Sequence, residues 1–311
     1  MFYGPTAVIP SSSSLCDGLL LLNKPPGITS FEALRPVKKA IVPVKAGHTG
    51  TLDKFACGLL LVLTGRALKL SSYFTNCGKR YDALMRLGLE TDTLDPEGRV
   101  VAEAPVPSKD AIEAVLYQFR GDIMQTPPEF SAIHLGGKRA SELARSGLPV
   151  EMKPRPITIH ELSLSAYEPP FARLSVHCSS GTYIRSLARD IALAAGSRAH
   201  LTGLTRTEVG AFRLSDALDL KPDEAAASVD IRNALLPMDR RVFDALSIPV
   251  CEVDEKSAQA LRCGKPLGRG FTPGADASAA RAAVFFRDSF IALLERYGIN
   301  GENAWRYSFV F

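Results

Sequence analysis

The stretch GHTGTLD at residues 47–53 constrains the fold of this chain more than any other part of it. Two glycines, two threonines, a histidine and an aspartate stand among these seven residues, a composition that suits neither a regular helix nor a regular strand. The apolar stretch GLLLVLTG follows at residues 58–65 and is typical of a buried strand. The sequence therefore predicts a loop that is fixed on a rigid strand, which suits functional residues.

Strand and helix patterns alternate irregularly along the rest of the chain. Every second residue is apolar over much of 79–87 and 171–178, as expected for half-buried strands. Apolar residues recur at helical spacing in 108–119 and 184–191, and a short apolar strand is expected over 18–22. Because these elements do not form a regular strand–helix–strand repeat, the sequence predicts an α+β fold.

Helix boundaries have their own signals. Thr29 and Glu32 have the spacing of a capping box, so a helix is expected to begin there. Pro36 is expected to kink or end the first part of this helix, because proline lacks the backbone donor and crowds the preceding turn. Residues 222–227 are acidic and rich in alanine, which indicates a surface helix.

The length of 311 residues favours about two domains. Residues 1–16, with four consecutive serines, are expected to form a disordered tail. Residues 17–244 are assigned to the main domain. From residue 245 the chain becomes a series of short segments with glycine and proline, which predicts a small, β-rich domain at 245–311.

Cysteine and charge patterns narrow the possible compartment and partners. The six cysteines show neither CxxC nor zinc spacing, so reduced thiols and no metal site are expected. No signal peptide or membrane-spanning run is recognised, which indicates a cytoplasmic protein. The formal net charge of +4 is a weak indication of a polyanionic partner.

Asp53 is the candidate for chemistry in the 47–53 stretch. A lone aspartate in a loop usually caps a turn. A phosphate-binding P-loop is excluded, because no Gly-Lys-Ser/Thr follows at the required spacing. Metal binding by His48 and Asp53 would need further ligands that the neighbouring residues do not supply. These residues alone leave a structural and a functional aspartate open.

The motif GHTGTLD with its following Gly-Leu-Leu strand resembles the catalytic motif of the bacterial tRNA pseudouridine-55 synthases, the TruB-type family. Further blocks resemble the family's motifs and stand in the family's order: LNKPPGITS at 22–30, KRY at 79–81, TDT at 91–93 with Asp95, QTPPEFSA at 125–132, GTYIRSL at 181–187, AHL at 199–201 and LTR at 204–206. One such block could arise by chance, whereas several in order identify the chain as a member of this family. The resemblance spans about residues 17–220.

This resemblance implies a pseudouridine-synthase fold, in which helices flank a central mixed, mostly antiparallel sheet. It also implies an RNA-binding insertion at about residues 125–152 and a PUA-like, RNA-binding C-terminal domain. The implied activity is isomerisation of uridine to pseudouridine at position 55 in the T-loop of tRNAs, by base flipping and aspartate-dependent cleavage of the glycosidic bond. No redox step occurs, so no cofactor is expected. The expected partner is the tRNA T-stem-loop, with no guide RNA and no membrane, and the protein is expected to be a monomer.

The same resemblance assigns the catalytic roles to Asp53, Tyr81 and Arg185. Asp53 would drive glycosidic cleavage, and the guanidinium of Arg185 would hold it ionised. Tyr81 would stack on the target uracil, with its hydroxyl near the ring carbon that loses a proton. From its strand position alone, Tyr81 is equally a core aromatic, and both readings can hold together.

Substrate binding is assigned, again by resemblance, to His48, Tyr183, Leu204 and Lys24. His48 would occupy the former place of the flipped base, and Tyr183 and Leu204 would line the base pocket. Lys24 would support the 47–53 loop or contact phosphate. Five further cations are candidates for phosphate contacts: Lys138, Arg139, Arg145, Arg198 and Arg206.

The chain departs from the family pattern at several positions. Lys54 stands where proline is usual and Cys57 where threonine is common, while His134 and Ser141 differ within the insertion. Lys54 is expected to lower the pKa of Asp53 or to touch phosphate. Two other functions stay open at this point: an RNA-folding protein without catalysis, and a synthase that acts on ribosomal RNA with a guide RNA.

Overall fold

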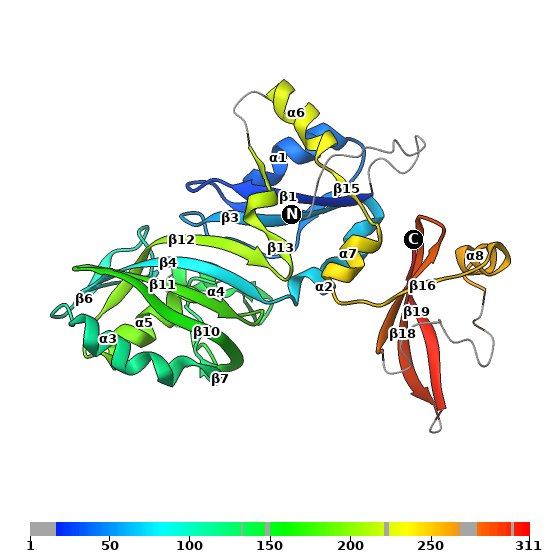
Figure 1. Ribbon diagram of the computed structural model, residues 1–311. Helices are drawn as coiled ribbons and strands as arrows, with labels where there is room; N and C mark the ends of the chain where they lie inside the picture. The colour runs from blue at the N-terminus through cyan, green and yellow to red at the C-terminus, as the bar shows by residue number, and fades with distance from the viewer. Residues whose placement is uncertain are drawn as a thin grey trace.

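The computed structural model describes residues 17–131, 133–146, 150–220, 224–265, 267, 279–299 and 302–311. The expected tail at 1–16 lies outside the described residues. The described part of the chain contains two small two-stranded sheets and is built mainly on two larger sheets, one of eleven strands and a separate one of four (Figure 1). Helices pack on both, so the α+β prediction is confirmed.

The large sheet is mixed but mostly antiparallel, as predicted. Its main path runs in the order β14 (Leu218–Asp219), β1 (Gly18–Lys24), β3 (Cys57–Thr64), β12 (Ala199–Val209), β4 (Lys79–Leu87), β11 (Phe171–Cys178), β10 (Arg155–Glu168) and β7 (Gly121–Gln125). The short strands β2 (Ala46–His48), β13 (Phe212–Arg213) and β15 (Leu236–Pro237) pair beside this path. Within this sheet, only the described pairs β1–β14 and β3–β12 are parallel.

Alternation along β4 follows the predicted pattern, because Tyr81, Ala83, Met85 and Leu87 are all buried on one face. Helix α5 (Ile184–Ala194) covers this face with its own buried stripe, so the predicted strand and helix share one core. The helix α3 (Lys109–Val115) and the 3₁₀ turn η2 (Leu116–Phe119) extend the same core.

Helix α1 (Ser30–Ile41) begins with the predicted capping box of Thr29 and Glu32. The helix continues through Pro36, so the expectation that it ends there is wrong. Its buried face packs on β1 and β3 in an aliphatic cluster, and this burial outweighs the one backbone hydrogen bond that proline cannot donate.

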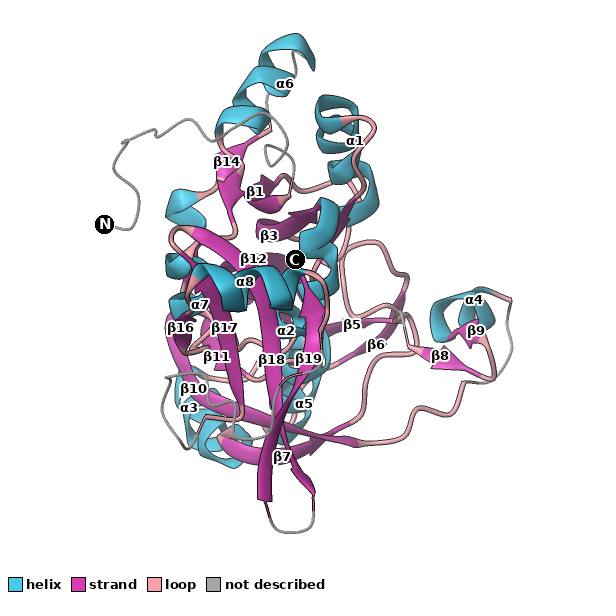
Figure 2. Ribbon diagram, turned by 90° about the vertical axis from the view of Figure 1, so that its right-hand side faces the viewer, coloured by secondary structure: helices cyan, strands magenta, loops and turns pink. Residues whose placement is uncertain are grey.

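The segment between β7 and β10 forms a small unit of its own. It contains the hairpin β8 (His134–Leu135) and β9 (Lys138–Arg139), followed by helix α4 (Ala140–Arg145). Figure 2 shows this unit standing away from the main sheet. A second two-stranded sheet, β5 (Leu89–Thr91) with β6 (Val100–Glu103), lies between β4 and α3 in the sequence. An RNA-binding role for 125–152 stays a prediction.

The C-terminal sheet consists of β16 (Val250–Glu252), β17 (Arg281–Phe286), β18 (Ser289–Ile299) and β19 (Glu302–Val310), with helix α8 (Glu255–Arg262) beside it. Helices α6 (Glu224–Asn233) and α7 (Arg240–Ala245) and the turn η3 (Leu214–Asp216) lead into it. The predicted surface helix at 222–227 therefore begins at Glu224, and residues 221–223 lie outside the described part. The domain boundary near residue 245 stays a prediction.

The two sheets share an apolar core. Phe243 of α7 contacts Phe285 and Phe290 of the C-terminal sheet, with ring centroids 5.6 and 4.4 Å apart. The same buried cluster includes Leu61 of β3 and Phe74 of helix α2 (Ser71–Thr75), which follows the turn η1 (Gly65–Leu70).

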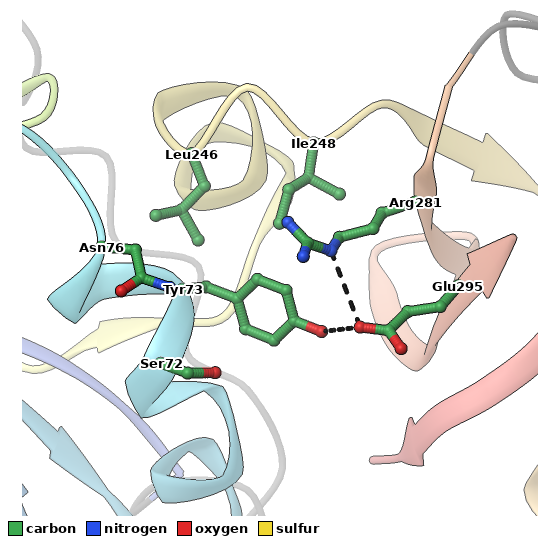
Figure 3. Close-up of a pocket in the computed structure, with 7 residues that line it drawn as sticks. All are labelled: Ser72, Tyr73, Asn76, Leu246, Ile248, Arg281 and Glu295. Carbon is green, nitrogen blue, oxygen red and sulfur yellow. Dashed lines mark hydrogen bonds and ion pairs between the residues drawn. The ribbon is translucent and has the colours of Figure 1, made fainter.

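A group of polar contacts lies beside this core and connects Tyr73 of α2 to the C-terminal sheet (Figure 3). The hydroxyl of Tyr73 donates to Glu295 at 2.9 Å and lies 2.9 Å from the hydroxyl of Ser308. The guanidinium of Arg281 lies 4.9 Å from the ring centroid of Tyr73. A cavity of about 140 Å³ opens here, and none of its lining residues is a predicted site residue.

Candidate functional site

The GHTGTLD stretch is a loop from Thr49 onward. Gly47 and His48 belong to β2, which pairs antiparallel with β3. The expectation of irregular backbone over all of 47–53 is therefore wrong for these two residues. Strand β12 pairs with β3 only at Cys57 and Gly58, so the rest of that edge of β3 can pair with β2.

Residues 49–56 are the irregular part, and hydrogen bonds fix them from several sides. The backbone N–H of Leu52 donates to the hydroxyl of Ser30 at 2.8 Å, and this hydroxyl donates back to the Leu52 carbonyl at 3.1 Å. The hydroxyl of Thr75 donates to the Thr49 carbonyl at 3.2 Å. The Asp53 side chain is thereby presented by a rigid segment.

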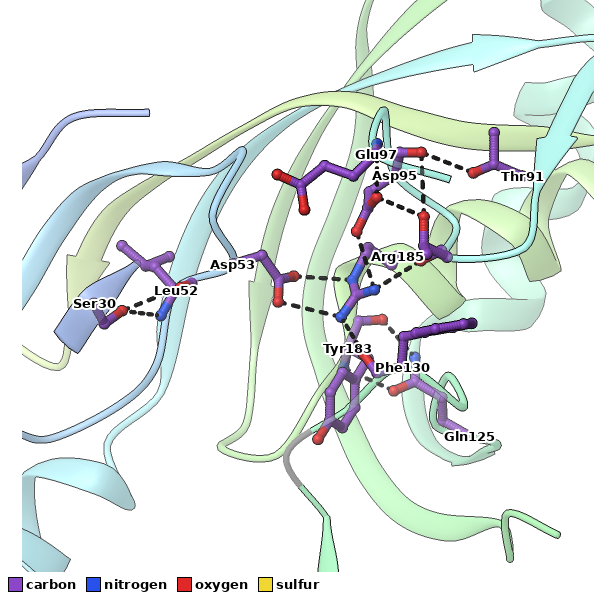
Figure 4. A network of polar contacts seen from close by, with 11 residues as sticks. Ser30, Leu52, Asp53, Thr91, Asp95, Glu97, Gln125, Phe130, Tyr183 and Arg185 are labelled. Atoms are coloured by element: carbon purple, nitrogen blue, oxygen red, sulfur yellow. Dashed lines mark hydrogen bonds and ion pairs between the residues drawn. The ribbon is translucent and has the colours of Figure 1, made fainter. Parts of the chain in front are cut away.

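Arg185, on the first turn of α5, holds the carboxylate of Asp53 (Figure 4). Nη2 of Arg185 donates to Oδ1 of Asp53 at 3.2 Å, and Nε lies 2.9 Å from Oδ2. Arg185 is only 4% exposed, whereas the Asp53 side chain keeps 35% of its surface open. A buried cation therefore faces a carboxylate that a substrate can still reach.

The same guanidinium has three further acceptors. Nη1 donates to Oδ2 of Asp95 at 3.2 Å and to the Thr93 carbonyl at 2.7 Å, while Nη2 donates to the Phe130 carbonyl at 2.9 Å. Figure 4 shows Asp53 and Asp95 on different sides of Arg185. These contacts fix the plane of the guanidinium before any substrate arrives.

Asp95 is a site residue to which the sequence assigned no role. Its carboxylate accepts from the hydroxyl of Thr93 at 2.6 Å and from the N–H of Glu97 at 3.0 Å, besides Arg185. It is 90 residues from Arg185 in the chain, so spacing gave no indication of the pair. Its place in the TDT block was the one available signal.

Burial raises the pKa of the Asp53 carboxyl above its usual range. The charge of Arg185 opposes this rise, and the charge of Asp95 adds to it. The expectation that Arg185 favours the ionised form agrees with the direction of its effect, but burial dominates. Asp53 is thus a stronger base than an ordinary aspartate.

Tyr81 is 9% exposed and lies in the same buried cluster as Leu52 and Leu204. Burial raises the pKa of its hydroxyl, the cation of Arg206 opposes the rise, and the charge of Asp53 adds to it. Leu52, the residue that precedes Asp53, belongs to the same buried cluster as Tyr81. Tyr81 is therefore a core aromatic that also borders the candidate site.

Tyr183 directly precedes α5 and is held by its backbone. Its N–H donates to Oε1 of Gln125 at 2.8 Å, and its carbonyl accepts from Nε2 of Gln125 at 3.1 Å. The guanidinium of Arg155 lies 4.8 Å from the centroid of its ring. Leu204 is 7% exposed on β12 and pairs with Ala83 of β4. The structure thus places both predicted pocket residues on elements that border Arg185 or Tyr81.

Lys24 is fully buried and binds backbone carbonyls. Its Nζ donates to Pro25 at 3.0 Å, to Ile28 at 2.7 Å and to Lys54 at 3.5 Å. Burial lowers its pKa to about 8. Of the two predicted roles, the structure therefore favours support of the Asp53 loop over phosphate contact.

His48 projects from β2, and its Nδ1 is buried without a hydrogen-bond partner among the described residues. Burial is the largest cause that lowers its pKa, and the charges of Arg206 and Lys38 contribute. The unprotonated imidazole is therefore favoured at neutral pH.

Residues 38–184 match the TruB family pseudouridylate synthase (N terminal domain). The tRNA pseudouridine synthase B of Aromatoleum aromaticum (strain DSM 19018 / LMG 30748 / EbN1) is 42% identical over 254 residues, which are 81% of this chain and 82% of that protein. The chain belongs to the TruB family of pseudouridine synthases. The family predicted from the sequence blocks is confirmed.

Other TruB relatives and solved structures agree. The tRNA pseudouridine synthase B of Borreliella burgdorferi (strain ZS7) is 48% identical over 204 residues, or 65% of this chain and 72% of that protein. A chain in the crystal structure of a Cbf5-Nop10-Gar1 complex is 25% identical with a TM-score of 0.69, covering 94% of this chain and 84% of that one. A chain of an H/ACA RNP bound to a substrate RNA has the same fold, at 24% identity and a TM-score of 0.66 over 94% of this chain and 83% of that one.

Lys54 and Cys57, two residues that differ from the TruB pattern, each contact a neighbouring side chain. Nζ of Lys54 lies 3.4 Å from Oε1 of Glu97, and both side chains are about half exposed. The ammonium of Lys54 thus faces Glu97, and the charges with the largest effects on the pKa of Asp53 are those of Arg185, Asp95 and Lys24. Sγ of Cys57 lies 3.3 Å from the hydroxyl of Thr205, so the thiol takes a polar position at the β3–β12 contact.

The candidate phosphate contacts differ in their exposure to solvent. Lys138 and Arg145 are exposed on the projecting unit, whereas nothing of the Arg139 side chain is described. Arg198 is 39% exposed and paired with Glu90 at 3.1 Å. Arg206 is 2% exposed, so its assignment as a phosphate contact is wrong, because backbone carbonyls in the core already accept from it.

Within the described ranges, no cluster of His, Cys, Asp and Glu side chains has the arrangement of a metal site. Across the same part of the chain, every helix is too short or too polar to cross a bilayer.

Proposed function

We propose that this TruB family member isomerises uridine to pseudouridine at position 55, in the T-loop of tRNAs. The observation that carries the proposal is the Asp53 carboxylate, which is accessible and held by buried Arg185, while Tyr81 lies in the same buried cluster as the preceding residue Leu52. Its TruB relatives are named tRNA pseudouridine synthase B, which supports tRNA as the substrate class.

The reaction breaks the bond between the ribose and the base nitrogen, and forms a bond between the ribose and a ring carbon. That carbon loses a proton and the nitrogen gains one, so no electrons or groups are exchanged with another molecule. Asp53 drives the cleavage as an ionised carboxylate, either as nucleophile or as base. The rigid guanidinium of Arg185 holds it in position, which lowers the entropic part of the barrier.

The remaining site residues act on the flipped base. Tyr81 stacks on the uracil, and its hydroxyl takes part in removing the proton from the ring carbon. Tyr183 and Leu204 line the pocket, and His48 occupies the space that the base leaves in the RNA stack. Lys24 acts indirectly, because it holds the backbone of Ile28 to that of Lys54, the residue that follows Asp53.

Docking of the tRNA uses the unit at 125–152 and the C-terminal domain. Lys138 and Arg145 are exposed on that unit and can contact phosphates. The protein acts as a monomer in the cytoplasm, without a metal, a cofactor or a guide RNA.

The test is pseudouridine formation in an unmodified tRNA transcript, mapped to the nucleotide, with wild type and Asp53→Asn. Asp53→Asn preserves the size of the side chain, so tRNA affinity is expected to stay while turnover is lost. A transcript with cytidine at the target position is the matched control. Near-normal turnover by Asp53→Asn would show that another group drives the cleavage.

The same experiment separates the rival functions. Conversion of bare tRNA by the purified protein excludes a requirement for a guide RNA. Tight tRNA binding by folded wild type without any conversion would favour the RNA-folding function. Equal support of tRNA folding by wild type and Asp53→Asn, with no pseudouridine from either, would establish that function instead.

A further inference from the structure

Arg206 lies where three strands of the large sheet meet. On β12 it pairs with Tyr81 of β4 on one side and with Gly58 of β3 on the other. Directly paired residues on neighbouring strands project from the same face, so the side chains of Arg206 and Tyr81 are neighbours. Arg206 is 2% exposed, and its charge is therefore committed to the interior.

The guanidinium of Arg206 connects the two ends of the segment that carries Asp53. Its Nε donates to the Leu59 carbonyl at 2.7 Å, and its Nη2 donates to the Gly50 carbonyl at 3.1 Å. Gly50 precedes Asp53 in the loop, and Leu59 follows it on β3. One rigid, planar group thus fixes the entry and the exit of the catalytic segment relative to Tyr81.

Its electrostatic effect acts on the same neighbours. Burial raises the pKa of Tyr81, and the Arg206 charge is the largest influence that opposes this rise. The same charge contributes to the lowered pKa of Lys24, Lys79 and His48. A permanent cation in the core therefore favours the deprotonated form of each group around the site.

We infer that Arg206 is a positioning residue for the isomerisation, which sets the Asp53 segment and the Tyr81 hydroxyl in their reactive arrangement. This inference rests on the proposed function. Arg185 cannot supply this role, because its donors already bind Asp53, Asp95 and the carbonyls of Thr93 and Phe130.

The first test is Arg206→Lys, which keeps the charge but replaces the planar fork with a single ammonium. The single-turnover rate of pseudouridine formation is measured at saturating protein and at a temperature where circular dichroism shows the variant folded. A displacement of about 1 Å at the reacting groups predicts a fall of about 100-fold in this rate, with tRNA affinity unchanged. Arg213→Lys is the matched control, since Arg213 is exposed and pairs loosely with Glu208.

The second test uses Arg206→Gln and a readout that a purely structural role would not move. Ionisation of Tyr81 is followed by absorbance as the pH is raised. The absorbance of Tyr81→Phe is subtracted from that of wild type, and the absorbance of the double variant Arg206→Gln/Tyr81→Phe is subtracted from that of Arg206→Gln. Loss of the cation is expected to move this ionisation to higher pH than in the protein with Arg206.

The outcomes are distinct. An inactive wild type would overturn the proposed function, whereas an active wild type with Arg206→Lys within about threefold of its rate would overturn the role of Arg206 alone. An unchanged ionisation of Tyr81 in Arg206→Gln would also overturn it. Loss of folding in both variants, with Arg213→Lys folded, would show that Arg206 serves only the stability of the sheet.

Discussion

Replacing Arg185 with lysine removes the planar group that connects Asp53 to Asp95. The guanidinium has four acceptor groups on different sides: the carboxylates of Asp53 and Asp95 and the carbonyls of Thr93 and Phe130. A lysine ammonium has its donors on one atom, so it cannot reach all of these positions. The charge stays, but the geometry is lost.

The magnitude follows from the contacts. If the ammonium keeps two of the acceptors, two charge-assisted hydrogen bonds are lost, each worth about 1.5–3 kcal/mol. The free energy of unfolding is therefore expected to fall by roughly 3–6 kcal/mol, because Arg185 is almost fully buried. A displacement of Asp53 by about 1 Å adds a fall of about 100-fold in the rate of the chemical step.

Two assays measure these effects separately. Urea denaturation gives the free energy of unfolding, and single-turnover pseudouridine formation on a tRNA transcript gives the rate for the folded protein. Arg213→Lys, on an exposed arginine, is expected to change stability by less than about 0.5 kcal/mol and to leave the rate unaltered. Arg185→Lys with stability and rate near those of wild type would refute the reasoning, because the fork would then be dispensable.

Two further predictions concern the backbone and the pH dependence of the same region. Gly58→Ala is expected to destabilise the fold by roughly 2–5 kcal/mol in urea denaturation, because φ is +101° and a Cβ would clash with the Arg206 backbone. Gly121→Ala, at φ +79° with open space around it, should lose only about 1–2 kcal/mol, and equal losses in both variants would contradict the steric argument. Lys24 has a pKa of about 8 in the folded protein against an ordinary 10.5, so the folded state releases its proton first as pH rises. Stability of wild type relative to Lys24→Met should therefore increase by up to roughly 3 kcal/mol between pH 8 and 10.5, and parallel pH profiles of the two proteins would count against it.

Local sequence patterns predicted the elements well because their causes are local. The alternation that ends at Leu87 and the capping box of Thr29 each depend on neighbours within a few residues, and both occur in the structure as expected. Of the two effects expected at Pro36, a kink or an end of the helix, the end does not occur, because the burial that keeps the helix intact comes from strands far away in the sequence.

Some residues of the candidate site could be predicted from the sequence, whereas others depend on contacts between distant parts of the chain. Asp53 and Arg185 were predicted as partners through the family resemblance, although they stand 132 residues apart. No spacing rule indicated that Asp95 would complete the network. A basic residue on a strand looks like a surface charge until its neighbours are known, so the sequence could not show that Arg206 is buried.

The apolar core shared by the two sheets makes the C-terminal segment part of the folding unit. Leu61 of β3 and Phe285 of β17 belong to one buried cluster, and Phe243 fills the space between the sheets. A chain cut before β16 would lose Phe285 and expose Leu61 and Phe243 to water, which favours aggregation over a smaller working enzyme. Studies of RNA binding by the C-terminal sheet therefore need the whole chain, with surface substitutions in place of truncation.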